Sequence, residues 1–194
     1  MLILASGSPR RLELLSTLGV ALEVIPADID ETPLKNESPE DFVLRMAEEK
    51  CTHVFKTQNG SPVLAADTIV VRDGMILGKA SSKEHAQEMI QSLQGHTHQV
   101  MTAVCLKKGD HSWSKRVTTQ VTMKSLSSQT IQDYLGTKEY EGKAGAYAIQ
   151  GIAASFITSV QGSVSSVIGL PLSETMDMLT EAKLDPDWSK AIPV

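Results

Sequence analysis

The N-terminal segment constrains the fold most, because a short apolar run meets a polar turn and then a helical pattern. Residues 2–5 (Leu-Ile-Leu-Ala) predict a short buried strand. Pro9 favours the first turn of a helix, where its missing N–H costs nothing. The apolar spacing continues to Leu18, and Gly19 marks the expected helix end. A strand, a tight turn and a helix start recur together at phosphate-binding sites.

Helical and strand-like patterns alternate along the rest of the chain, which favours an α/β fold with a mixed sheet. Residues 62–71 form an apolar run rich in β-branched side chains and predict a buried strand. Asp73-Gly74 is a hairpin signal. A chain of 194 residues suits one domain, or one core with two lobes around a cleft, so we expect residues 1–194 to form a single two-lobed domain. Further strands are expected at 21–25, 75–77, 97–106, 113–123 and 154–160, and further helices at 38–55, 82–93, 127–135 and 171–182.

The charge of the chain argues against a long nucleic acid as the main partner. The net charge is -5 at pH 7, and no run rich in Lys and Arg occurs. Proteins that bind DNA or RNA usually carry a basic stripe, because phosphate neutralisation dominates their affinity. A small anion is a different case, since a few well-placed donors bind it whatever the net charge.

The cysteines and the apolar stretches indicate the compartment. Cys51 and Cys105 lie far apart and form no C-x-x-C pair, so a disulfide framework is not expected. The apolar start of the chain is too short for a signal peptide, and no stretch reaches membrane-spanning length. We therefore expect a cytoplasmic protein with no membrane attachment.

The polar turn at residues 6–11 (Ser-Gly-Ser-Pro-Arg-Arg) is the first candidate ligand site. A helix N-terminus carries a partial positive charge and unpaired N–H donors. Arg10 and Arg11 add forked donors that match phosphate oxygens, and Ser6 adds a hydroxyl. The alternative is that Pro9 only starts a helix and that both arginines are solvated.

Asp67 is the second candidate, because it stands in an otherwise apolar run at residues 63–71. A carboxylate there is costly unless it is paired or metal-bound. Asp67 is therefore a candidate metal ligand or general base; the alternatives are an exposed edge position or a buried arginine partner. Asp28 and Glu31 lie in an acidic loop whose oxygens suit Mg²⁺ or Mn²⁺, and Glu31 is the stronger candidate.

The Gly-rich segment 141–151 is the third candidate site. Its glycines permit close backbone approach to a ligand. The Gln150 amide both donates and accepts, so it could read a base edge. The alternative is a Gly-rich connection with Tyr147 packed in the core.

Other lysines and histidines give weaker signals. Lys50 and Lys79 are candidate phosphate partners, but the spacing before Lys79 and the Ala80 after it exclude a Walker motif. His96 and His98 would share one face of a strand, and two histidines alone make a weak metal site. No G-x-S-x-G or H-E-x-x-H pattern occurs, so serine hydrolase and zinc protease chemistry have no support.

Taken in order, these segments resemble the Maf family of nucleotide pyrophosphatases. The resemblance runs from residue 2 to about residue 182. It implies an elongated mixed sheet with flanking helices around a deep cleft, similar to inosine triphosphate pyrophosphatases. It also implies a divalent metal and a homodimer. The resemblance is carried by Leu4–Arg11, Ala66–Thr68, Gly78-Lys79, Lys143–Gly151 and Val167–Leu172.

The resemblance also implies roles for individual residues. The ending Ala-Tyr-Ala-Ile-Gln-Gly at 146–151 looks like the branch that acts on dTTP and UTP, rather than on 7-methyl-GTP. Ala80 departs from the proline that the family usually has there. Asp67 would be the proton acceptor, and Arg10, Thr68 and Gln150 would set specificity. Supporting contacts would come from Ser6, Arg11, Lys50, Lys79 and Lys143, with Glu31 and Asp67 as metal ligands.

The sequence therefore predicts hydrolysis of dTTP and UTP to the monophosphate and pyrophosphate with Mg²⁺ or Mn²⁺, and modified pyrimidine nucleotides are further candidate substrates. Asp67 would deprotonate a water that attacks the α-phosphorus. Two alternatives stay open. A non-catalytic regulator of cell division would bind the triphosphate without releasing pyrophosphate. A nucleic-acid module is disfavoured by the acidity and by the few aromatic residues available for stacking.

Overall fold

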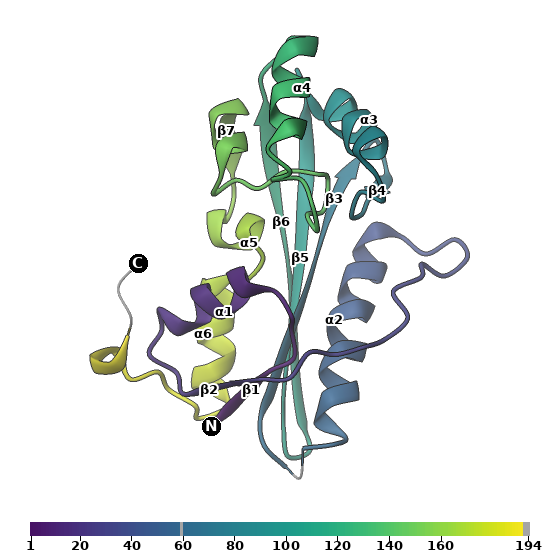
Figure 1. The fold of residues 1–194 in the computed structure, drawn as a ribbon. Helices are drawn as coiled ribbons and strands as arrows, with labels where there is room; N and C mark the ends of the chain where they lie inside the picture. Colours follow the sequence, from purple (N-terminus) through teal and green to yellow (C-terminus); the bar gives the residue numbers. More distant parts are fainter. Residues whose placement is uncertain (59, 192–194) are drawn as a thin grey trace. The chain divides into compact units, whose positions relative to one another are not determined.

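The computed structural model describes residues 1–58 and 60–191, and its strands form a seven-stranded sheet (Figure 1). The strand order is β2-β1-β3-β5-β6-β7, with β4 paired to β3. β1 runs parallel to β2 and β3, whereas the β3–β4 and β6–β7 pairs are antiparallel. The predicted α/β fold with a mixed sheet is therefore confirmed. The strands are β1 (Leu2–Leu4), β2 (Leu22–Val24), β3 (Val63–Arg72), β4 (Met75–Leu77), β5 (Thr97–Lys108), β6 (His111–Met123) and β7 (Ile157–Gln161).

Three of the helices begin where the sequence supplies a serine cap. Ser38, Ser82 and Ser127 each accept a hydrogen bond from the backbone N–H three residues later. No helix among the described residues is long and apolar enough to cross a membrane. The α-helices are α1 (Pro9–Ser16), α2 (Pro39–Phe55), α3 (Lys83–Leu93), α4 (Ser128–Gly136), α5 (Val164–Ile168) and α6 (Leu172–Glu181), and the 3₁₀ helices are η1 (Ile152–Phe156) and η2 (Trp188–Lys190).

The structure corrects the prediction for residues 154–160, which were expected to form a strand. Their first part belongs to the 3₁₀ helix η1, and β7 begins only at Ile157. The Glu139 carboxylate accepts hydrogen bonds from the backbone N–H groups of Ile152 and Ala153, which ties this apolar segment into a helical turn. The short helices α5 and η2 were not predicted, because a few residues carry little periodic signal.

The chain divides into two compact units. Unit 1 comprises Met1–Asp67, Thr102–Val117 and Gly169–Val194, and unit 2 comprises Thr68–Met101 and Thr118–Ile168. The strands β3, β5 and β6 contribute residues to both units.

The core of unit 1 includes α2 and the neighbouring strands. Val43 and Met46 of α2 are fully buried, as is Leu64 of β3. The Cys51 thiol of α2 donates a hydrogen bond to the Val63 carbonyl over 3.2 Å, which places this helix against β3 (Figure 1). Cys51 and Cys105 are both free thiols, and both are buried.

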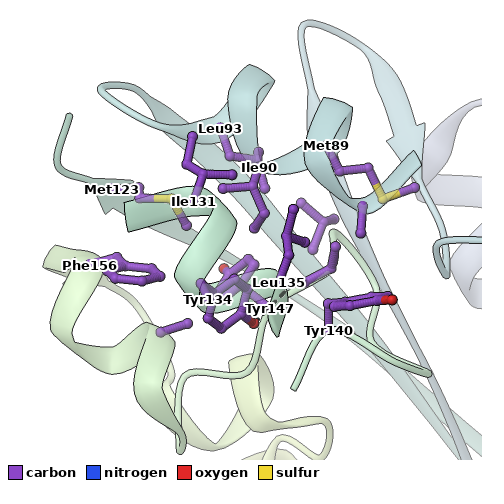
Figure 2. Close-up of a cluster of buried hydrophobic side chains, with 14 of the residues drawn as sticks. Met89, Ile90, Leu93, Met123, Ile131, Tyr134, Leu135, Tyr140, Tyr147 and Phe156 are labelled. Atoms are coloured by element: carbon purple, nitrogen blue, oxygen red, sulfur yellow. Dashed lines mark hydrogen bonds between the residues drawn. The ribbon is translucent and has the colours of Figure 1, made fainter. Parts of the chain in front are cut away.

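The core of unit 2 is a hydrophobic cluster that includes aromatic side chains and residues of the packed helices α3 and α4 (Figure 2). The rings of Tyr134 and Phe156 meet edge to face, with their centroids 5.3 Å apart. All three tyrosines of the chain lie in this cluster. A buried tyrosine hydroxyl needs a hydrogen-bond partner, so the cluster also fixes polar groups around it.

We predict that Gly145→Ala destabilises the protein by more than Gly142→Ala. Both glycines have positive φ angles, 65° and 67°, so both substitutions carry a conformational cost of about 1–2 kcal/mol. A Cβ at residue 145 would also contact the Val70 side chain at 2.8–3.0 Å, whereas a Cβ at residue 142 would meet no atom within 4 Å. Overpacking should add about 1–3 kcal/mol at residue 145, measured by urea unfolding. Equal losses in the two variants would contradict this packing.

Candidate functional site

The polar turn at residues 6–11 is held by side-chain hydrogen bonds within unit 1. The buried Ser6 hydroxyl accepts from the Ser8 N–H and from Arg11 Nη1, each over 3.2 Å. Arg11 Nε donates to the Gly169 carbonyl over 2.9 Å. The Ser8 side chain does not cap α1, so its oxygen does not satisfy the first N–H groups of this helix. The turn therefore combines a helix start with an arginine held in a defined position.

A buried ammonium group joins two carboxylates in the same unit. Lys50 Nζ lies 2.7 Å from Asp67 Oδ1 and 2.8 Å from Glu31 Oε1. Lys50 and Asp67 are only 7% and 8% exposed, whereas the Glu31 side chain is 46% exposed. The ion pair compensates the cost of placing Asp67 in an apolar strand. A lysine from α2 fills the role of the buried arginine considered from the sequence.

Arg11 of the turn interacts electrostatically with these carboxylates. Burial lowers the pKa of the Arg11 guanidinium, and the Asp67 and Glu31 carboxylates oppose that shift. The positive charge of Arg10 lowers the pKa of Arg11 further, and burial lowers the pKa of Arg10 itself. Arg11 therefore links the turn electrostatically to the two carboxylates, and Arg10 precedes it in the chain. Unit 1 thus brings together six predicted site residues: Ser6, Arg10, Arg11, Glu31, Lys50 and Asp67.

The carboxylate pair fits a divalent cation. Among the described residues, no three His, Cys, Asp or Glu side chains gather as a metal site. Asp67 and Glu31 nevertheless direct one oxygen each to the same Lys50 nitrogen, so their oxygens converge. Mg²⁺ commonly takes one or two protein carboxylates and completes its shell with substrate phosphates and water. These two residues could supply the protein's share of such a shell.

Unit 2 holds the other four predicted site residues. Lys79 and Ala144 form an antiparallel bridge, and the Gly145 N–H donates to the carbonyls of Leu77 and Gly78 over 3.1 Å. This pairing fixes the segment that carries Lys143 beside the segment that carries Lys79. Thr68 on β3 is partly buried, and Gln150 is exposed. The substrate contacts assigned to Thr68, Lys79, Lys143 and Gln150 stay predictions.

The two histidines do not form a shared metal site. His98 is buried, and its Nε2 lies 2.8 Å from the Tyr147 hydroxyl, whereas His96 is exposed and precedes β5. Tyr147 is 5% exposed and packs in the core, which was the alternative interpretation of the Gly-rich segment. Tyr147 therefore bears out the alternative, and contact of the exposed Gln150 with a base stays a prediction.

Sequence reasoning did not single out Glu139 and Tyr134. The Glu139 carboxylate accepts backbone hydrogen bonds from Ile152 and Ala153, and the Tyr134 hydroxyl donates to the Ala146 carbonyl. These partners lie 12 to 14 residues further along the chain. No helical or strand periodicity links residues at such separations, so only the folded loop reveals the contacts.

Comparison with known proteins matches the Maf-like protein family over residues 1–182. The chain belongs to the Maf family. Among curated relatives, a dTTP/UTP pyrophosphatase of Zymomonas mobilis is 49% identical over 183 residues, 93% of this chain and 91% of that protein. Proteins of the same name from Anaeromyxobacter dehalogenans and Escherichia coli K12 are each 46% identical. The alignments cover 97% of both chains for the former, and 92% of this chain and 91% of the relative for the latter.

Among solved structures, the Staphylococcus aureus Ham1 protein matches 63% of this Maf chain and 71% of its own chain. The TM-score is 0.43 and the identity is 16%, a likeness too low to establish a shared fold. The predicted similarity to inosine triphosphate pyrophosphatases and the deep cleft therefore stay predictions. The Maf assignment rests on the family match and on the curated relatives.

We predict that Lys50→Met lowers the free energy of unfolding by about 3–5 kcal/mol, because it leaves the buried Asp67 carboxylate without its ammonium partner. Chemical unfolding at pH 7 would measure the loss. Lys56→Met is the matched control, because Lys56 is exposed at the end of the same helix. A Lys50→Met variant as stable as the control would exclude the ion pair as a structural element.

We further predict a pH-dependent stability step that belongs to His98. Burial, with a smaller effect of the Arg72 charge, lowers the pKa of His98 from 6.5 to about 4. Between these values the unfolded chain binds a proton that the folded chain does not, so stability falls as the pH is lowered. Between pH 7 and pH 5 the loss should be about 2 kcal/mol. His98→Gln should reduce the loss by that amount in urea titrations, and an unchanged pH profile would contradict it.

Proposed function

We propose that this chain hydrolyses dTTP and UTP to the nucleoside monophosphate and pyrophosphate. Its curated relatives at 46–49% identity bear the name dTTP/UTP pyrophosphatase. The observation that carries the proposal is the Asp67 carboxylate, which is buried, paired with Lys50 and electrostatically coupled to Arg11. This group offers a base beside fixed cations, which is the combination that phosphoryl transfer needs.

Asp67 acts as the general base in the proposed mechanism. It accepts a proton from a water molecule while that water attacks the α-phosphorus. The bond from the α-phosphorus to the bridging oxygen breaks, and pyrophosphate leaves with the electron pair. Lys50 holds the orientation of Asp67 through its ion pair. General-base catalysis typically contributes about 10²–10⁴-fold in rate.

Arg10, Arg11 and the turn at residues 6–11 bind the polyphosphate chain. The guanidinium groups and the N–H donors at the start of α1 neutralise charge that develops on the phosphate oxygens. Ser6 keeps Arg11 in place through its hydroxyl. In unit 2, Lys79 and Lys143 give further phosphate contacts, and Thr68 and Gln150 select the base.

A divalent cation, Mg²⁺ or Mn²⁺, completes the proposed site, with Glu31 and Asp67 as its protein ligands. When bound, it supplies Lewis-acid neutralisation of phosphate charge. Glu31 is the more exposed of the two carboxylates, so it is accessible to an incoming cation.

We predict that Asp67→Asn retains the fold and loses at least about 10²-fold in pyrophosphate release. The amide keeps the shape of the carboxylate but no longer accepts a proton from water. Turnover would be measured with dTTP, UTP, CTP and modified pyrimidine triphosphates, each with Mg²⁺ or Mn²⁺. Asp73→Asn is the matched control, because Asp73 is an exposed turn residue whose φ of 50° suits asparagine.

The outcomes of that assay separate enzyme from regulator. Near-normal turnover in Asp67→Asn would remove Asp67 from the role of base. Tight triphosphate binding by the wild type with no pyrophosphate release would favour the non-catalytic regulator. Release from CTP as fast as from UTP would contradict the selection of dTTP and UTP.

Assembly and location complete the proposal: a homodimer in the cytoplasm. The two free, buried thiols agree with a reducing compartment. Light scattering should give about twice the chain mass of 21.0 kDa, and a monomer at micromolar concentration would contradict the dimer.

A further inference from the structure

We propose that Glu139 is a positioning residue for base recognition, because its carboxylate fixes the backbone immediately after Gln150. This inference rests on the proposed function, since it requires Gln150 to contact the pyrimidine. Glu139 lies shortly after α4 and is partly buried. It belongs to none of the segments that carry the family resemblance.

The Glu139 carboxylate holds two consecutive backbone donors. Its Oε2 accepts from the Ile152 N–H over 2.7 Å, and its Oε1 accepts from the Ala153 N–H over 3.1 Å. These are the first two N–H groups of η1, which a helix cannot satisfy from within. Each oxygen serves one donor, and both bonds gain strength from the negative charge. A glutamine has a single acceptor atom and would satisfy only one of them.

Gly151 packs directly against this carboxylate. Its φ of -109° lies outside the left-handed region that favours glycine, so the sign of φ does not explain the glycine here. A Cβ at this position would overlap the carboxyl group of Glu139. The absence of a side chain at Gly151 therefore leaves the space that the Glu139 carboxylate occupies.

The backbone before Gln150 is fixed from α4 as well. The Tyr134 hydroxyl donates to the Ala146 carbonyl over 3.1 Å, and its ring is anchored in the core of unit 2 (Figure 2). Burial, reinforced by the Glu139 charge, raises the pKa of Tyr134, so the hydroxyl stays a donor. The Gly151 N–H donates to the Ala148 carbonyl over 3.1 Å and closes a turn that contains Gln150.

Gln150 is thus an exposed residue in a turn that is held on both sides. A side chain on a fixed turn loses less conformational freedom when a ligand binds than one on a mobile loop. The advantage concerns the base that Gln150 contacts and not the phosphate chain. Loss of the two hydrogen bonds from the backbone to Glu139 should therefore weaken nucleotide binding and leave binding of a bare polyphosphate unchanged.

Glu139→Gln tests this directly by calorimetric titration with two ligands. One is the α,β-methylene analogue of UTP, which keeps the base but resists hydrolysis, and the other is inorganic triphosphate. We expect the variant to bind the UTP analogue about tenfold more weakly, which corresponds to one lost charge-assisted hydrogen bond. Inorganic triphosphate should bind both proteins equally. Glu141→Gln is the matched control, because Glu141 is an exposed glutamate two residues away.

Two further variants show whether Glu139 acts through this turn. Gly151→Ala should reproduce the selective loss, because the added methyl group displaces the carboxylate. Glu139→Gln combined with Gln150→Ala should bind the UTP analogue no more weakly than Gln150→Ala alone, since the two residues act in series. Amide hydrogen exchange at Ile152 and Ala153 should be faster in Glu139→Gln without any ligand.

Distinct outcomes would overturn the two ideas. Equal weakening of both ligands, no weakening, or additive losses with Gln150→Ala would remove the positioning role. A wild type that releases no pyrophosphate from UTP would overturn the proposed function, while the ratio of the two affinities would still decide the role of Glu139. A wild type that binds the UTP analogue no better than inorganic triphosphate would overturn base recognition and the positioning role together.

Discussion

The candidate site of unit 1 depends on one buried ammonium group. Lys50 reaches from α2 to Asp67 in β3 and also pairs with Glu31 in the acidic loop. Without this cation, a carboxylate in an apolar strand would have to be protonated or exposed, and both states would remove it as a base in a fixed position. The same contact links a helix, a strand and a loop that are distant in sequence. The Lys50–Asp67 ion pair therefore stabilises the fold and also positions the carboxylate of the proposed site.

Unit 2 contains a glycine-rich loop that is held in one conformation by side-chain hydrogen bonds. Glycines leave the backbone many alternatives, and loops of this kind are usually mobile. Here the core cluster supplies the restraint, because the rings of Tyr134 and Tyr147 are buried in it. The Tyr134 hydroxyl donates to the Ala146 carbonyl in the loop, and the hydroxyl of the loop residue Tyr147 forms a hydrogen bond with His98. Glu139 restrains the far end of the loop. Buried aromatic rings thus serve both as core and as fixed hydrogen-bonding groups.

Strand β3 connects these two arrangements within one element. Asp67 is the last residue of β3 that belongs to unit 1, and Thr68 is the first that belongs to unit 2. The base of the proposed reaction and one predicted specificity residue are therefore neighbours in the chain. The Maf family match covers residues 1–182 and so includes segments of both units.

The sequence alone determined much of the secondary structure, the fold class and the position of the candidate carboxylate. Local signals specified the helix starts at Ser38, Ser82 and Ser127, the hairpin at Asp73-Gly74 and the mixed α/β class, because caps, turns and periodicity act between near neighbours. An isolated aspartate in an apolar run already marked position 67. Tertiary structure alone decided which cation pairs with it, that the stretch before β7 becomes a 3₁₀ helix, and that Glu139 holds the turn after Gln150. Those outcomes depend on groups 12 or more residues apart, whose meeting is fixed by packing of the whole chain and by no local pattern.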